Sequence, residues 1–176
     1  MTALELEDYI ARSPQGLDTE PNFYRNYCKA QILVGCGRHN ESLRFLQEAY
    51  GEASTVIKAG KEVFIWGGLY YSIGGLYAVT LDYLGQVETA ETIFNEIIEY
   101  NPTGLYIGEY AVFLHRRKRD FEKAQSYYTK ALHLFPEHSS IHLKYAGFLR
   151  HVRRDLKGVI AINHCILCTI CFIEGL

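Results

Sequence analysis

Residues 104–136, GLYIGEYAVFLHRRKRDFEKAQSYYTKALHLFP, predict two short helices joined by a tight turn, and the segments on both sides are imperfect copies of this unit. In the following copy the offset is 35 residues: Tyr110, Ala111, Phe113 and Leu114 return as Tyr145, Ala146, Phe148 and Leu149, and Arg119 and Asp120 return as Arg154 and Asp155. In the preceding copy the offset is 34 residues: Ala124, Tyr128, Ala131 and Pro136 correspond to Ala90, Phe94, Ile97 and Pro102. A period of this length with small, aromatic and proline residues at fixed positions indicates helical hairpins stacked into a solenoid.

This pattern resembles the tetratricopeptide repeat (TPR) family. In its second helix that family places a small residue, an aromatic residue four positions later, a second small residue three beyond that, and a proline five further on. All four positions match here, at Ala124, Tyr128, Ala131 and Pro136. In the first helix the family's tryptophan and Leu-Gly pair fall near Gly108, Ala111 and Val112, where only Ala111 fits. The resemblance implies an all-α fold, a right-handed superhelical solenoid of stacked antiparallel helix hairpins.

A second resemblance is to the half-a-TPR repeats of RNA-processing scaffolds. Their first helix carries Tyr-Ala-x-Phe, as residues 110–113 and 145–148 do here. The tryptophan and the glutamate of that family are missing, because their places are taken by Ile107, His142, Leu114 and Leu149. We therefore rank the TPR interpretation first and keep an RNA-processing scaffold as the alternative.

The composition indicates a folded chain of about one domain, since 48% of its 176 residues are apolar. Eighteen basic and 20 acidic residues give a formal net charge of −2, so any electrostatic recognition must be local. Glu5, Glu7 and Asp8 stand where a signal peptide would need positive charge. Five cysteines, an odd number, do not form a disulfide framework. We expect a cytoplasmic location, or a nuclear one.

The domain organisation follows from the repeat frame. We expect a loose leader at residues 1–21, a TPR-like repeat domain at 22–157 and an atypical apolar tail at 158–176. The repeats of that domain fall at about 22–61, 62–102, 103–136 and 137–157 onward. In the first of them, the second-helix positions are taken by Ser42, Leu46 and Ala49.

An insertion separates the first two repeats, because the interval from Ser42 to Ala90 is about 14 residues longer than one period. We expect the surplus to lengthen the second helix of the first repeat and the first helix of the next. The run 63–81 contains no charged residue, and its length is near that of a membrane span. Four glycines dilute its hydrophobicity, so we interpret it as a buried helix. Its glycines, at a spacing of seven, would let a neighbouring helix approach closely: Gly67, Gly68, Gly74 and Gly75.

No catalytic constellation stands out, so we expect a protein that is not an enzyme and binds no cofactor or metal. The sharpest metal candidate is the group His164, Cys165, Cys168 and Cys171, which has an iron–sulfur spacing but lacks a fourth cysteine. On a helix its thiols would rotate away from one another, so we interpret these cysteines as small apolar residues. His138 and His142 are four apart, as zinc ligands on one helix face would be, but only His142 lies clearly inside the helix. We interpret both as turn histidines.

Two basic runs occupy the turns within the last two repeats: His-Arg-Arg-Lys-Arg at 115–119 and its 35-residue image Arg-His-Val-Arg-Arg at 150–154. Stacking would set the two runs side by side as a basic edge that docks an acidic partner segment. The alternative is a solvated turn, since exposed turns are commonly charged. We expect reversal of Arg117 and Arg153 to leave the helical content unchanged. The residues of the basic edge are Arg116, Arg117, Lys118, Arg119, Arg150, Arg153 and Arg154.

The TPR resemblance also implies a partner-binding groove, since proteins of that family usually hold peptides on the concave face lined by first helices. Transferring those positions gives Tyr24, Tyr27, Gln31, Tyr106, Glu109, Phe113, Lys144 and Phe148. Family members that capture a carboxylate use lysine and asparagine at positions taken here by Tyr27, Gln31, Gly75 and Val79. The alternative is that the aromatic residues only fill the space between first helices. We expect a non-catalytic scaffold or adaptor whose partner is a protein or peptide rather than nucleic acid, with no membrane span.

The end of the chain departs from the repeat frame. Gly158 to Ile173 runs without a formal charge, where a terminal repeat normally presents a polar outer face. The tail is either the end of a truncated or alternatively spliced array, or a segment that buries itself against a second chain or a membrane. It is shorter than the roughly 20 residues that span a bilayer, so we expect it to drive self-association.

Overall fold

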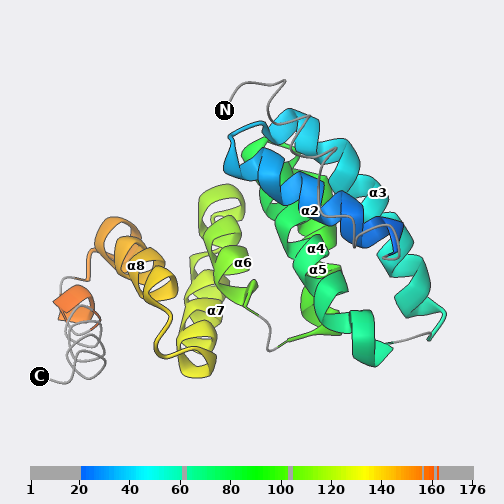
Figure 1. Ribbon diagram of the computed structural model, residues 1–176. Coiled ribbons are helices and arrows are strands. Elements are labelled where there is room, and N and C mark those ends of the chain that lie inside the picture. Colours follow the sequence, from blue (N-terminus) through cyan, green and yellow to red (C-terminus); the bar gives the residue numbers. More distant parts are fainter. Residues whose placement is uncertain (1–20, 61–62, 103–104, 156, 161, 163–176) are drawn as a thin grey trace, which may run out of the picture. The chain divides into compact units, whose positions relative to one another are not determined.

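The computed structural model describes residues 21–60, 63–102, 105–155, 157–160 and 162 (Figure 1). This part of the chain is helical and contains no strand, as the sequence predicts. The leader, most of the tail and the candidate metal group at 164–171 lie outside the described residues. The helices are α2 (Asn22–Gly35), α3 (His39–Lys58), α4 (Val63–Tyr83), α5 (Val87–Tyr100), α6 (Ile107–Phe113), α7 (Phe121–Leu134) and α8 (Ser139–Phe148). Short π-helical turns, η2 (Leu114–Lys118) and η3 (Leu149–Arg153), extend α6 and α8.

The chain divides into two compact units, Met1–Ile97 and Ile98–Leu176. In the first unit α2 contacts α3, α3 contacts α4, and α2 also contacts α4. In the second unit α6 contacts α7, α7 contacts α8, and α6 also contacts α8. In each unit the leading first helix, α2 or α6, therefore packs against its own second helix and against the first helix of the next hairpin. This is the packing order of stacked helical hairpins.

The second helices are built around three buried positions that recur in each hairpin. The side chains at these positions are at most 1% exposed in all three helices. The first is small and the second large in each helix, and the third is alanine in α3 and α7 but Ile97 in α5. Small residues bring the second helix close to its neighbours, and the large residue between them fills the core. The burial confirms the second-helix pattern predicted from the sequence. The nine residues are Ser42, Leu46 and Ala49 in α3, Ala90, Phe94 and Ile97 in α5, and Ala124, Tyr128 and Ala131 in α7.

A left-handed residue ends the first helix of every hairpin, five residues before the first small position. It is Gly37 and Gly85 in the first two hairpins, with φ of 75° and 79°, and Arg119 and Arg154 in the last two, with φ of 57° and 55°. Such a residue commonly closes a helix, and glycine adopts the conformation without steric cost. The recurrence at Arg154 places Val159 at the first small position of a fourth hairpin.

The turns that contain the left-handed residues Arg119 and Arg154, the two arginine turns, share one hydrogen-bonding scheme. The amide of Asp120 donates to the carbonyl of Leu114 over 3.2 Å, and the amide of Asp155 donates to the carbonyl of Leu149 over 3.0 Å. Each aspartate then caps the next helix, because its Oδ1 accepts from a backbone amide three residues on. The amides are those of Lys123, at 3.0 Å, and Gly158, at 2.9 Å. This scheme fixes where each basic run lies relative to the following helix.

Arg119→Gly is expected to raise the free energy of unfolding by up to about 1 kcal/mol, because the left-handed backbone strains any residue with a Cβ. Arg116→Gly is the matched control: Arg116 lies inside η2 with negative φ, so glycine there should cost roughly 1 kcal/mol. Urea unfolding of both variants measures the difference. If Arg119→Gly destabilises the chain as much as Arg116→Gly does, the turn is not strained.

The inserted residues lengthen α3 to 20 residues and α4 to 21, whereas α2 and α5 have 14 each. This confirms the predicted place of the surplus. Part of the added length holds a buried cluster around Tyr50 of α3. Its hydroxyl donates to Oε2 of Glu96 over 2.6 Å and lies 3.0 Å from the hydroxyl of Tyr70, and its ring stacks on that of Tyr70. Burial, followed by these hydrogen bonds, raises the pKa of Tyr50, so the hydroxyl stays protonated.

Gly74 shows why α4 has a glycine where it packs closely against neighbouring helices. A Cβ built on Gly74 would lie 2.4 Å from Cγ2 of Ile97 and 3.0 Å from the ring of Tyr50. The predicted close approach is therefore real at this position. It does not extend to Gly68, which is exposed and has open space around its Cα.

Candidate functional site

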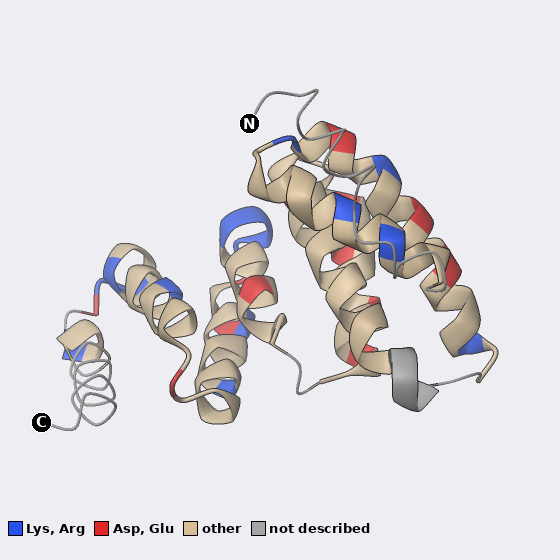
Figure 2. Ribbon diagram, in the orientation of Figure 1, with Lys and Arg blue, Asp and Glu red and all other residues tan. Residues whose placement is uncertain are grey.

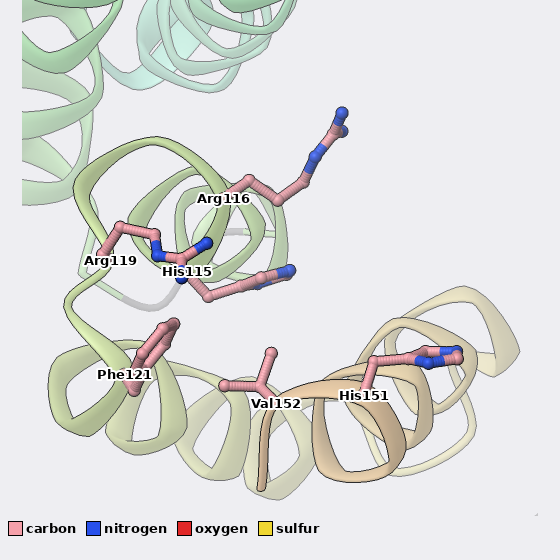
Figure 3. A pocket seen from close by; sticks show the side chains of 6 residues that line it. All are labelled: His115, Arg116, Arg119, Phe121, His151 and Val152. Atoms are coloured by element: carbon pink, nitrogen blue, oxygen red, sulfur yellow. The ribbon is translucent and has the colours of Figure 1, made fainter.

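The two basic runs contribute to one pocket in the second unit. The pocket has a volume of about 420 Å³ and is lined by His115, Arg116, Arg119, Phe121, His151 and Val152 (Figure 3). Three of these residues come from the turn after α6, one from the start of α7 and two from η3. The run at η2 is the dense group of basic residues beside α6 and α7 in Figure 2.

The pocket combines an apolar floor with a cationic rim. In Figure 3 the side chains of Val152 and Phe121 point into the space, whereas those of Arg116 and His151 extend away along its edge. The Arg119 guanidinium lies over the Phe121 ring, with 5.4 Å between Cζ and the ring centroid. This cation–π contact holds a positive charge against an apolar surface.

His115 forms the inner wall of the pocket and is held in place from behind. Its Nδ1 lies 3.1 Å from the Tyr128 hydroxyl and 3.3 Å from the carbonyl of Ala111, and its ring packs on that of Phe148. Burial lowers the pKa of His115 below its ordinary value; the hydrogen bond to Ala111 opposes this shift and the charge of Arg116 adds to it. The imidazole is therefore neutral at pH 7, and the positive charge of the pocket comes from its arginines.

Arg153 differs from the other members of the basic edge, which are exposed. Its Nη2 is 2.6 Å from Oε1 of Glu122, its Nε donates to Oε1 of Gln125 over 3.0 Å, and its guanidinium lies over the Phe148 ring. These contacts tie η3 to α7. Within the described residues, neither Arg116 nor Arg119 is paired with a carboxylate.

Arg153→Glu is expected to lower the free energy of unfolding by about 1 kcal/mol, because it removes an ion pair and a hydrogen bond and sets two carboxylates together. The expectation that reversal of this residue leaves the helical content unchanged stays a prediction, because a loss of this size lowers the stability of the chain without unfolding it. Arg150→Glu, the exposed control in the same run, should change stability by less than about 0.5 kcal/mol. Equal melting temperatures for the two variants would show that the contacts of Arg153 carry no stability.

The residues predicted for the groove separate into accessible and buried sets. Tyr106, Glu109 and Lys144 line a pocket of about 210 Å³ together with Leu105, Gly108, His138, Ser140 and Ile141. The Lys144 ammonium forms an ion pair with the Glu109 carboxylate, which joins equivalent faces of α8 and α6. On α2, in the other unit, Gln31 is exposed, Tyr24 is half-buried and Tyr27 is buried.

Phe113 and Phe148 are each 1% exposed and belong to the core. Phe148 packs against Tyr128 and Tyr145, with ring centroids 5.4 and 6.1 Å apart. Phe113 stacks on Tyr110 at 6.2 Å. Neither phenylalanine is available to a ligand, so at these two positions the aromatic residues fill the space inside and between hairpins.

The family comparison matches this part of the chain. A family model described as Tetratricopeptide repeat matches residues 113–138, which cover η2, the arginine turn and α7. The chain has a TPR-like helical repeat fold. No curated protein matches it. The matched residues contain Ala124, Tyr128, Ala131 and Pro136, the four positions on which the sequence resemblance rests.

The described part of this TPR-like protein contains no group of three or more residues that could hold a metal ion. Of the two histidines considered for zinc, His142 is buried and its Nε2 donates to the carbonyl of Pro136 over 2.5 Å. His138 instead lines the smaller pocket. No described helix is long and apolar enough to cross a membrane.

Sequence reasoning about the TPR-like frame found the arginines of the larger pocket but missed its apolar part. Phe121 follows the cap residue Asp120, and Val152 interrupts the second basic run. An apolar residue within or beside each charged turn was the sequence feature that could have indicated the apolar part of the pocket. The small pocket's apolar residues, Leu105 and Ile141, were also missed, because they flank the transferred groove positions rather than occupy them.

Proposed function

We propose that this TPR-like protein is a non-catalytic scaffold, in the cytoplasm or the nucleus, that binds a protein or peptide partner. One observation carries the proposal: residues one repeat apart line common pockets on two surfaces. Glu109 and Lys144 do so on the first helices, and the two basic runs do so at the turns. Repeat proteins build extended binding surfaces by adding equivalent positions in this way.

Affinity purification from cells with paired surface variants tests the scaffold function. The double variant Glu109→Lys with Lys144→Glu inverts the first-helix face but keeps an ion pair, and Arg116→Glu with Arg150→Glu inverts the basic edge. Lys130→Glu, on the exposed face of α7, is the control. We expect a partner protein that is retained by the control and lost from one double variant, with unchanged circular dichroism. A set of bound proteins that neither inversion alters would contradict the proposal.

RNA binding is the second candidate, supported by the Tyr-Ala-x-Phe segments and by six exposed cations on the basic edge. It predicts an affinity that falls linearly on a log–log plot against salt, with a slope that counts the phosphates neutralised. A protein partner held mainly by apolar contacts would show little salt dependence. Filter binding of a uridine-rich RNA across a salt series separates the two. Self-association through the tail remains a prediction, because the tail lies outside the described residues.

A further inference from the structure

The pocket between the two basic turns combines apolar and cationic side chains, so it should favour one kind of acidic partner over others. Its lining residues are His115, Arg116, Arg119, Phe121, His151 and Val152. We infer that it takes an apolar anchor side chain from an acidic segment of the partner, with carboxylates on both sides of the anchor pairing with arginines of the rim. This inference rests on the proposed function and specifies the partner for one of its surfaces.

The floor of the pocket calls for an apolar group. Val152 and Phe121 point into the space, and the neutral ring of His115 closes its inner side. A carboxylate or phosphate placed against Val152 and the imidazole of His115 would lose water without gaining a charged donor from either side chain, which is unfavourable. An aliphatic or aromatic side chain would instead bury apolar surface on both sides of the contact.

The rim calls for negative charge on either side of that group. Arg116 and Arg119 stand at one end without a carboxylate partner among the described residues, and the exposed Arg150 and Arg154 belong to the run at the other end. Arg153, which is paired with Glu122, does not line the pocket. Carboxylates from a partner would therefore meet arginines whose charge is uncompensated, and such charge-assisted hydrogen bonds are strong.

The dimensions fit a short linear segment. A volume of about 420 Å³ is far more than a carboxylate needs and lies in the range of pockets that enclose organic groups, about 300–1,000 Å³. Packed helices lie about 8–10 Å apart. An extended chain covers that distance in about three residues, at roughly 3.3 Å each. Acidic residues that flank a central anchor would thus reach both basic turns.

Base stacking is less suited to the same surface. Phe121 is the only phenyl ring of the pocket within the described lining residues, and the Arg119 guanidinium already lies over it. That contact occupies one face of the ring, so the pocket offers few aromatic faces on which successive bases could stack. Single-stranded RNA is therefore an outcome of the test rather than the proposed ligand.

Fluorescence anisotropy with labelled ten-residue peptides tests the inference on the full chain at fixed salt. The probe has one central leucine flanked on both sides by glutamates; a second peptide replaces the leucine by alanine, and a third replaces the glutamates by glutamine. We expect the alanine and glutamine peptides to bind at least about tenfold more weakly than the probe, because removal of an anchor contact usually lowers affinity by about this factor. A uridine-rich RNA of similar length is measured alongside.

Protein variants locate the site. Val152→Phe fills the pocket without changing charge and should weaken the probe by about tenfold, as should Arg116→Gln with Arg119→Gln. Lys130→Gln is the matched control, because it removes one exposed charge from α7 outside the pocket and outside both basic runs, and it should weaken the probe less than about threefold. The alanine-peptide comparison stands even if a protein variant folds poorly.

Equal binding of the leucine and alanine peptides would overturn the anchor. Equal losses for Lys130→Gln and for the pocket arginines would show a diffuse charge effect and overturn the pocket. Binding of the RNA in preference to every peptide would overturn the class of partner. If no acidic peptide binds while the surface inversions still release a cellular partner, this inference fails and the scaffold function stands. If the inversions release nothing, the scaffold function fails.

Discussion

Ala124→Leu is expected to lower the free energy of unfolding by about 1–3 kcal/mol, because a larger side chain must displace packed neighbours. Ala124 is fully buried at the first small position of α7, one turn before the buried Tyr128. The Tyr128 ring contacts Tyr145 and Phe148 of α8, so overpacking here should loosen the contact between successive hairpins as well.

Ser126→Leu is the control for this substitution. Ser126 lies on the exposed face of the same helix, so leucine there should change stability by less than about 0.5 kcal/mol. Urea unfolding followed by circular dichroism measures both variants. If Ala124→Leu unfolds at the same urea concentration as the parent, the small positions do not set the distance between helices and the repeat frame is wrong.

Gly74→Ala is expected to destabilise the first unit by up to about 2 kcal/mol. The new Cβ would press on Ile97 and Tyr50, at a cost of about 1–3 kcal/mol. The gain in helix propensity, roughly 1 kcal/mol, offsets part of that cost. A shift of the Tyr50 ring would also disturb its hydrogen bond to Glu96.

Gly68→Ala separates the two effects, because Gly68 is in the same helix but has nothing within 4 Å of a built Cβ. Alanine there should stabilise the chain by up to about 1 kcal/mol through propensity alone. Thermal melting of the two variants should therefore move in opposite directions. Stabilisation by both substitutions would mean that α4 does not need glycine to approach α5.

The second helices could be predicted because their chemistry is repetitive. A small residue followed at fixed spacing by a large one requires one packing geometry, and the burial of these positions in α3, α5 and α7 follows from that requirement. The place of the insertion was also predictable, since the surplus length had to lengthen α3 and α4 or form a loop. Gly74 lies on the predicted close face, but Gly68 shows that spacing alone does not identify which glycines approach a neighbour.

The candidate sites were harder to predict, because they depend on which side of a helix faces the next hairpin. Phe113 and Phe148 occupy first-helix positions that resembled groove positions, yet their rings turn into the core. The π-helical turns after α6 and α8 shift where the basic runs emerge, and no sequence pattern marked them. The pairing of Arg153 with α7 likewise depends on contacts 28 residues apart in the chain.

Chemical-shift mapping tests most directly the claim that this TPR-like protein holds an acidic partner segment between its two arginine turns. The backbone amide shifts of ¹⁵N-labelled full-length protein would be followed by NMR while the leucine-anchored acidic peptide is added. The account predicts that the largest saturable changes fall on His115 to Phe121 and on Arg150 to Val152, with little change in α2 and α3. Changes confined to α2 and α3, or spread evenly over all exposed cations, would contradict it.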